Sequence, residues 1–184
     1  MTYIKNQYYH IYNRGIDKKR IFYQDRNYEY FMELIEKNAE RYRVSILAYC
    51  LIPNHYHLFV RQNSDIPLSR FIQTLTNVFV QAMNNQLKRK GTLFEGRAIA
   101  KLIDKDAYFL HMCRYIHLNP IKHNLVTNLD EWKYSNYHNC IDEKSDDSIF
   151  IKKIFGSCLV YKEFVEDYTP TIEEMKNFQK YAME

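Results

Sequence analysis

Apolar and polar residues along this chain of 184 residues follow two different periods, which alternate through its first two thirds. Segments rich in β-branched and aromatic residues predict strands over residues 8–14, 43–51, 55–61 and 97–103. Segments whose apolar residues recur every three or four positions predict helices over residues 27–42, 68–88 and 106–119. The order β-α-β-β-α-β-α predicts an α+β fold, with one antiparallel sheet of the ferredoxin-like type and helices packed on one face.

Turn and capping residues mark the ends of several of these elements. Asp25 is placed to cap the first helix, and Pro53-Asn54 separates the second and third strands. Those two strands should therefore form an antiparallel hairpin. Pro120 should stop the last helix near Asn119, because proline lacks the backbone N–H that a helix interior needs.

Beyond residue 125 the chain becomes acidic and less regular. Residues 142–148 predict an exposed loop, and residues 149–155, 158–168 and 171–181 are short helical candidates. The sequence therefore predicts a main domain over residues 1–125, the candidate catalytic part, and an acidic C-terminal extension over residues 126–184 that is mainly helical.

Composition and charge distribution narrow the class of partner. The chain is 46% hydrophobic and 26% charged, which is typical of a soluble globular protein with a core. Residues 1–125 hold 19 Lys and Arg and 10 Asp and Glu, a net of +9, whereas residues 126–184 hold 7 and 12, a net of −5. A basic, tyrosine-rich body suggests a polyanion such as nucleic acid. The alternative is that these charges are only a solvated surface.

The cysteines and the absence of long apolar runs indicate the compartment. None of the 4 cysteines belongs to a C-x-x-C pair, which argues against a zinc knuckle. Cys50 and Cys113 lie in apolar runs and are interpreted as small core residues. No secretory signal and no stretch of about 18 apolar residues is found, so we expect a cytoplasmic protein with reduced thiols and no membrane partner.

The tripeptide His55-Tyr56-His57 is the first candidate for chemistry. Successive side chains of a strand point to opposite faces, so the two imidazoles leave the same face. Two neutral imidazoles on one face can bind one divalent metal ion. An H-x-H pattern is short, however, and occurs by chance, so two histidines on a half-exposed strand without a metal ion are the alternative interpretation.

The helix predicted over residues 106–119 carries the second candidate. His111, Tyr115 and Asn119 are spaced by four residues and should share one face. The Asn119 carbonyl oxygen suits a hard divalent cation, and a tyrosine hydroxyl beside a cation can act as a nucleophile. The alternative is that Tyr115 packs in the core and that Asn119 caps the helix.

Two groups of basic residues are candidates for binding a single-stranded nucleic acid: Arg14, Lys18, Lys19 and Arg20, and then Lys88, Arg89, Lys90, Arg97 and Lys101. Aromatic residues that could stack on unpaired bases are interleaved with them, namely Tyr12, Phe22, Tyr23, Phe79 and Phe94. Such aromatic residues more often belong to a core, and both interpretations stay open at this point.

Taken together, these segments resemble the single-tyrosine HUH transposases, and most closely the REP-associated tyrosine transposases. The resemblance runs from about residue 8 to about residue 137. It rests on the order and spacing of YHIYNRG (9–15), IFYQDRNYEYF (21–31), LIPNHYHLFV (51–60), GTLFEGRAIAKLID (91–104), RYIHLNPIKHNLV (114–126) and EWKYSNY (131–137).

The resemblance implies an HUH endonuclease fold and a DNA transposase that cleaves and rejoins single-stranded or hairpin DNA. His55 and His57 match the family's paired metal ligands, Tyr115 matches its nucleophile, and Asn119 matches the polar residue that completes the metal site. Mg²⁺ or Mn²⁺ is the implied cofactor, and a 5′-phosphotyrosine is the implied intermediate. Arg14, Gly15 and Asn54 also match the family pattern.

Two other functions remain as alternatives. One is a structure-specific nucleic-acid-binding protein of the same fold without turnover, and the other is a hydrolytic metal nuclease. The resemblance leaves open whether the protein works as a monomer or a homodimer, because related enzymes use the tyrosine helix of either the same or a partner chain.

Overall fold

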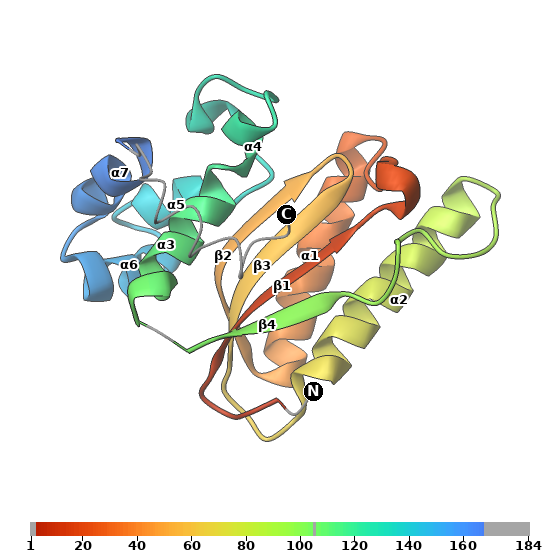
Figure 1. Ribbon diagram of the computed structural model, residues 1–184, viewed down its shortest axis with the longest axis horizontal. Helices are drawn as coiled ribbons and strands as arrows, with labels where there is room; N and C mark the ends of the chain where they lie inside the picture. The colour runs from red at the N-terminus through yellow and green to blue at the C-terminus, as the bar shows by residue number, and fades with distance from the viewer. Residues whose placement is uncertain (1–2, 105, 168–184) are drawn as a thin grey trace.

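Four antiparallel strands in the order β2-β3-β1-β4 form the centre of the computed structural model, which describes residues 3–104 and 106–167 (Figure 1). The strands are β1 (Tyr8–Arg14), β2 (Val44–Ile52), β3 (His55–Gln62) and β4 (Ile99–Ile103). Each strand begins and ends within two residues of the bounds that the sequence predicts. β1 and β3 lie in the middle of the sheet, as the ferredoxin-like order requires, so the predicted α+β fold is confirmed.

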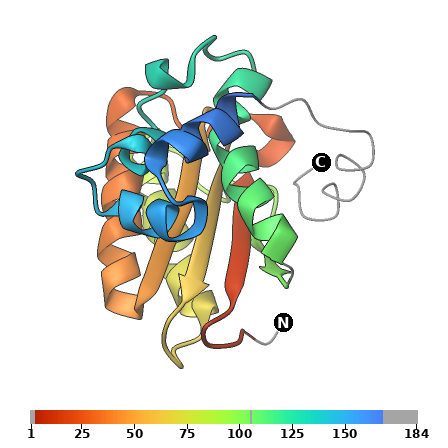
Figure 2. The ribbon, with the colours of Figure 1, turned by 90° about the vertical axis from the view of Figure 1, so that its left-hand side faces the viewer.

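Helices α1 (Asp25–Tyr42) and α2 (Leu68–Gln86) cover one face of the sheet (Figures 1 and 2). Their apolar stripes meet the side chains of Tyr56, Leu58 and Val60, which β3 sends to this face as predicted. All three are fully buried, and the main hydrophobic core forms here.

Helix α1 begins two residues earlier than the sequence predicts. Gln24 is its cap, and the Asn27 side chain accepts a hydrogen bond from the Gln24 backbone N–H at 3.0 Å. Asp25 therefore lies in the first turn, where its carboxylate pairs with Lys133 at 3.0 Å. Both side chains of that pair are largely exposed, so it adds little to stability.

The opposite face of the sheet is also covered by helices, which corrects the prediction that they pack on one face. Helix α3 (Asp106–His117) and the C-terminal helices pack there (Figure 2). β2 and β3 are apolar on both sides, because Ala48, Cys50 and Phe59 point away from the main core and into a second one. Strands of that kind must be shielded from water on both faces.

The tyrosine-bearing helix ends two residues before the predicted end at Asn119, but Pro120 does not end helical structure in this segment. Helix α3 ends at His117, and the one-turn helix α4 (Asn119–Lys122) follows with Pro120 in its first turn. Proline is tolerated there because the first backbone N–H groups of a helix have no partner within it. Residues Lys122 and His123 are thereby brought back toward the sheet.

The C-terminal part forms η2 (Leu129–Glu131), α5 (Tyr137–Ile141), α6 (Asp147–Phe155) and α7 (Cys158–Glu166). Helices α6 and α7 correspond to the candidates at 149–155 and 158–168, while the candidate at 171–181 lies outside the described residues. The second core joins α3 to α5, α6 and α7, so it contains residues from both sides of the predicted boundary at 125. That boundary stays a prediction.

The four cysteines are interior residues, as expected for small apolar side chains. All four are buried and free, with Cys50 and Cys113 in the second core as predicted. Within residues 3–104 and 106–167, no helix has the length and apolar character needed to cross a membrane.

Buried hydrogen bonds link the C-terminal end of α3 to α7 and to β2. His117 is 0% exposed, and its Nδ1 lies 2.6 Å from the Tyr161 hydroxyl of α7 while its Nε2 lies 3.0 Å from Asn136 Oδ1. An amide oxygen can only accept, so His117 carries its proton on Nε2, and Tyr161 donates to Nδ1. Asn136 Oδ1 also accepts from the Tyr49 backbone N–H at 2.7 Å, which extends the connection to β2.

Removing the Tyr161 hydroxyl should weaken the fold. Tyr161→Phe leaves His117 Nδ1 buried without a donor, and we expect the free energy of unfolding to fall by about 1–3 kcal/mol. Urea denaturation measures this change. The matched control is Tyr30→Phe on α1, a half-buried tyrosine, where we expect a change within about 0.5 kcal/mol. Equal losses in both variants would contradict this role of Tyr161.

Stability should also fall as the pH drops below about 6.5, the ordinary pKa of a free histidine. Burial lowers the pKa of His117 to about 4, so the unfolded chain binds a proton at this residue before the folded chain does. The free energy of unfolding should decrease between pH 6.5 and 4, by up to about 1.4 kcal/mol per pH unit for this group, and the group should have no effect above that range. Urea unfolding at pH 7, 6 and 5 measures the slope. His117→Gln should make it shallower, and an unchanged slope would contradict the assignment.

Candidate active site

His55 and His57 lie side by side on β3, on the face covered by α3. Both are buried, at 1% and 0% exposed, and their ring centres are 4.9 Å apart. The tight turn at Pro53-Asn54 places His55 at the start of the strand, and the two-residue period turns Tyr56 to the opposite core. The predicted placement of the two imidazoles on one face is therefore confirmed.

Asn119 and Tyr115 approach this pair from the junction of α3 and α4. The Tyr115 ring is half-buried, and its centre lies 5.5 Å from that of His57. Asn119 Nδ2 donates to the Tyr115 backbone carbonyl at 2.8 Å, which fixes the orientation of the amide. His111 does not join the group. Instead, its Nδ1 accepts from Arg114 at 2.6 Å, and its ring lies near Phe164 of α7.

Three buried atoms in this cluster have no hydrogen-bond partner: His55 Nε2, His57 Nε2 and Asn119 Oδ1. They are three of the seven such side-chain atoms among the described residues, which concentrates unsatisfied polar groups at one place. Buried polar atoms normally have partners, so a group of three points to a bound ligand. Two imidazole nitrogens and one amide oxygen are suitable ligands for a divalent metal ion.

The protonation states of the two histidines also suit a cation. Burial, together with the smaller effects of the nearby His123 and Arg14 charges, lowers the pKa of His55 to about 3, while the Asn119 amide acts in the opposite direction. Burial, followed by His10 and His55, holds the pKa of His57 well below its usual range. Both imidazoles are therefore neutral at pH 7. Asn54 Oδ1 lies 2.8 Å from His55 Nδ1 and accepts a hydrogen bond from it, which places the His55 proton on Nδ1 and the lone pair on Nε2.

The candidate metal site consists of two histidines and an asparagine. Within the described parts of the chain, no three His, Cys, Asp or Glu side chains are placed to share a metal ion. The candidate site depends on an asparagine as its third ligand, as the resemblance to the HUH transposases implies.

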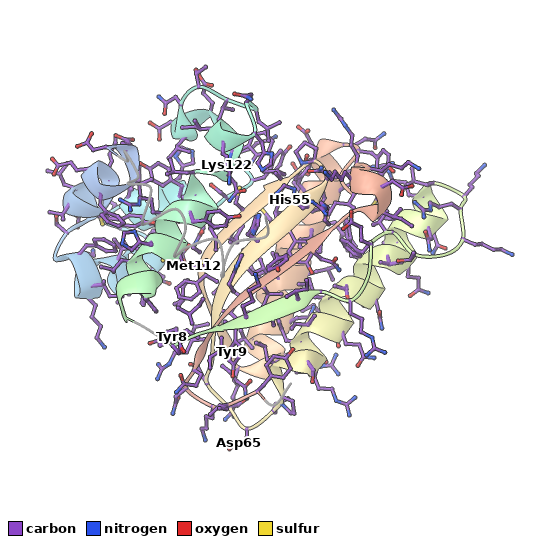
Figure 3. The ribbon with its side chains drawn as sticks, in the orientation of Figure 1. Tyr8, Tyr9, His55, Asp65, Met112 and Lys122 are labelled. Atoms are coloured by element: carbon purple, nitrogen blue, oxygen red, sulfur yellow. The ribbon has the colours of Figure 1, made fainter. Side chains whose placement is uncertain are left out.

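Three further residues surround this site that the sequence reasoning did not assign to it. His10 of β1 lies 2.9 Å from His57, measured from Nε2 to Nδ1. Lys122 Nζ lies 5.4 Å from the centre of the Tyr115 ring, and the His123 ring centre lies 4.9 Å from that of His55. Figure 3 shows His55 and Lys122 at the same end of the sheet. Lys122 and His123 were missed because Pro120 was expected to end the helix, and His10 because its position depends on strand register.

The two predicted groups of basic residues come together in space. The Ile16 N–H donates to the Leu93 carbonyl at 3.1 Å and the Glu95 N–H to the Arg14 carbonyl at 2.9 Å, so residues 14–20 and 88–97 lie side by side. A Cβ at Gly15 would lie 2.1 Å from the Lys19 carbonyl oxygen, so this turn requires glycine. Arg14 pairs with His55 in the sheet, which puts both loops beside the histidine pair.

Most of the basic side chains in these loops are exposed: Lys18, Lys19, Arg20, Lys88, Lys90 and Arg97. Arg14 pairs with Glu95 through two hydrogen bonds of 3.0 and 3.1 Å, and Arg89 donates to the Thr92 carbonyl. Lys101 lies apart from the loops on β4, with its Nζ 5.3 Å from the centre of the Tyr12 ring.

The interleaved aromatic residues are mostly core residues. Tyr12, Phe22, Phe79 and Phe94 are between 0% and 6% exposed, which rules out stacking on bases by these four as they stand. Tyr23, at 40% exposed, is the exception among the five candidates.

Comparisons with known proteins identify relatives of this chain in sequence and in fold. A curated protein of Haemophilus influenzae named "Putative REP-associated tyrosine transposase" is 27% identical over 150 residues, which cover 69% of this chain and 85% of the relative. A solved structure described as a REP-associated tyrosine transposase bound to a REP hairpin aligns with a TM-score of 0.66 at 20% identity, covering 77% of this chain and 82% of that one. At that identity the structural match supports the shared fold.

The match to a known family covers most of the sheet domain and not only a short motif. A family profile described as "Transposase IS200 like" matches residues 3–119, a range that begins before β1 and ends at Asn119. It contains the four strands, both histidines of β3 and Tyr115. The chain therefore belongs to the IS200-like family of transposases.

Proposed function

We propose that this transposase cleaves and rejoins single-stranded or hairpin DNA with a divalent metal ion, using Tyr115 as the nucleophile. The observation that carries the proposal is the set of three unpartnered buried atoms, His55 Nε2, His57 Nε2 and Asn119 Oδ1, beside the Tyr115 ring. A protein that only bound DNA would not need these four side chains in this arrangement.

His55, His57 and Asn119 would hold Mg²⁺ or Mn²⁺ through those atoms. When bound, the ion would withdraw charge from the scissile phosphate. The asparagine oxygen favours these two ions, since hard divalent cations prefer oxygen ligands. Sequestration of the histidines from water keeps them neutral and available.

Tyr115 would attack the phosphorus atom in line with the departing 3′ oxygen. The bond from phosphorus to the 3′ oxygen breaks, a bond from the Tyr115 oxygen to phosphorus forms, and the phenol proton is lost while the 3′ oxygen gains one. Lys122, with Nζ 5.4 Å from the ring centre, would place a positive charge near the negative charge that develops during the attack. The resulting 5′-phosphotyrosine keeps the energy of the phosphodiester, so another 3′-OH can reverse the step and join a new strand.

The paired loops of residues 14–20 and 88–97 would bind the DNA backbone next to this centre. Their exposed Lys and Arg side chains can contact phosphates, which position a nucleic acid without reading its sequence. The structural relative bound to a REP hairpin supports a folded single strand as the substrate. The Tyr115 ring lies beside His57 of the same chain, with centres 5.5 Å apart, which supports cleavage by a monomer, and a homodimer remains compatible with the same site.

A covalent adduct is the direct test. Incubating the protein with end-labelled hairpin DNA and Mn²⁺ should give a protein–DNA adduct that survives denaturation, as measured by gel electrophoresis. Tyr115→Phe should abolish it, because the attacking oxygen is removed. His57→Ala should also abolish it, and Tyr30→Phe on α1 should leave it unchanged.

The remaining outcomes of that experiment identify the alternatives. An adduct that persists in Tyr115→Phe would contradict the nucleophile. Cleavage that persists in Tyr115→Phe but is lost in His57→Ala would identify a hydrolytic metal nuclease. DNA binding without cleavage by the wild-type protein would identify a binding protein without turnover.

DNA binding should weaken steeply as salt rises, because Lys and Arg side chains that bind phosphates release counterions. Replacing Lys88 and Lys90 by alanine should reduce the slope of log K against log salt by about 1.4 on single-stranded DNA, since each phosphate that is no longer neutralised accounts for about 0.7. Fluorescence anisotropy between 50 and 300 mM salt, roughly the range over which such binding weakens, measures the slope. The matched control is alanine at Lys144 and Lys153, two exposed lysines of the C-terminal part, and an equal effect there would contradict the proposed interface.

A further inference from the structure

A third histidine lies directly behind the metal-ligand candidate His57. His10 of β1 is 0% exposed, and its Nε2 is 2.9 Å from His57 Nδ1. The two rings are nearly parallel, with an interplanar angle of 17° and centres 5.2 Å apart. We propose that His10 is a positioning residue that fixes the tautomer and orientation of His57 for metal binding, an inference that rests on the proposed metal site.

The two rings share few protons, which limits how they can pair. A neutral imidazole carries one proton, so one nitrogen donates while the other accepts. His57 Nε2 has no partner and is the atom available to a cation, which places the His57 proton on Nδ1. The His57 Nδ1–H then donates a hydrogen bond to His10 Nε2, so neutral His10 carries its own proton on Nδ1.

His55 also has a hydrogen-bond acceptor at its Nδ1, but there the acceptor is an asparagine. Its Nδ1 faces Asn54 Oδ1 at 2.8 Å, again leaving Nε2 without a partner. Each ligand candidate therefore has an acceptor behind it, a side-chain amide from the turn for His55 and an imidazole from the next strand for His57. Metal-binding histidines generally need such an acceptor, which sets the tautomer and holds the ring.

Strand pairing puts His10 in this position. In the antiparallel pair of β1 and β3, Tyr12 lies opposite His57 and His10 lies opposite Phe59, so His10 is the diagonal neighbour of His57 on the same face. The Tyr115 ring is also close, with its centre 6.0 Å from that of His10. His10 thus lies against both the ligand candidate and the nucleophile candidate.

Two variants separate positioning from simple packing. His10→Phe keeps an aromatic ring but removes the acceptor, whereas His10→Gln keeps an acceptor oxygen. Tyr9→Phe is the matched control, because Tyr9 is the adjacent residue, faces the opposite core and bonds to Ile4 through its hydroxyl. Thermal unfolding of each variant reports any general loss of stability.

The measurements are the His57 tautomer, from long-range ¹H–¹⁵N NMR of the metal-free protein, and the affinity for Mn²⁺ alone, from calorimetry. In the wild type we expect the His57 proton on Nδ1. His10→Phe should lose that preference and bind Mn²⁺ about 10- to 100-fold more weakly. His10→Gln should recover most of the affinity, and Tyr9→Phe should bind as the wild type does.

The possible results distinguish this inference from the proposed function. Unchanged Mn²⁺ affinity in His10→Phe, or a loss in His10→Gln as large as in His10→Phe, would overturn the positioning role. If His10→Phe does not fold, a wild-type His57 proton on Nε2 would overturn it equally. A wild type that fails to bind Mn²⁺ while its His57 tautomer still responds to His10 would support the positioning role and overturn the metal site.

Discussion

The two-sided burial of β3 is the constraint on which the rest of the structure depends. The strand alternates strictly, so Tyr56, Leu58 and Val60 enter the core under α1 and α2 while His55 and His57 face the other layer. A shift of one residue in pairing would exchange these faces and bury the imidazoles in an apolar core. The main core therefore sets the register that brings both histidines to one place.

The layer of helices formed by α3 and the C-terminal part packs on the face of the sheet that carries the two histidines. Helix α3 must lie against β2 and β3 to cover their outer apolar side chains, and this brings Tyr115 beside His57. The buried bonds of His117 to Tyr161 and Asn136 fasten the end of α3 to the C-terminal helices and to the segment before α5. The described part of the acidic extension, residues 126–167, thus supports the position of α3, although it lies outside the matched family range.

The strands, the two long helices and the pairing of His55 with His57 could be predicted because each rests on a local period. The proximity of Tyr115 and Asn119 to that pair was implied by the resemblance alone, since no local rule joins residues about 60 positions apart. Their chemical roles stay predictions that the geometry supports.

The misses have physical reasons. The positions of Lys122 and His123 depend on the separate one-turn helix α4, which has Pro120 in its first turn. Proline is unfavourable in a helix interior but is tolerated in a first turn. His10 depends on the diagonal register between two strands, which the sequence of either strand alone does not specify.

The central claim is that His55, His57 and Asn119 hold one divalent metal ion beside Tyr115. Anomalous diffraction from crystals grown with Mn²⁺ tests it most directly, because it locates the ion independently of activity. The account predicts a single peak within about 2.3 Å of His55 Nε2, His57 Nε2 and Asn119 Oδ1. A peak elsewhere, or no peak at saturating Mn²⁺, would contradict it.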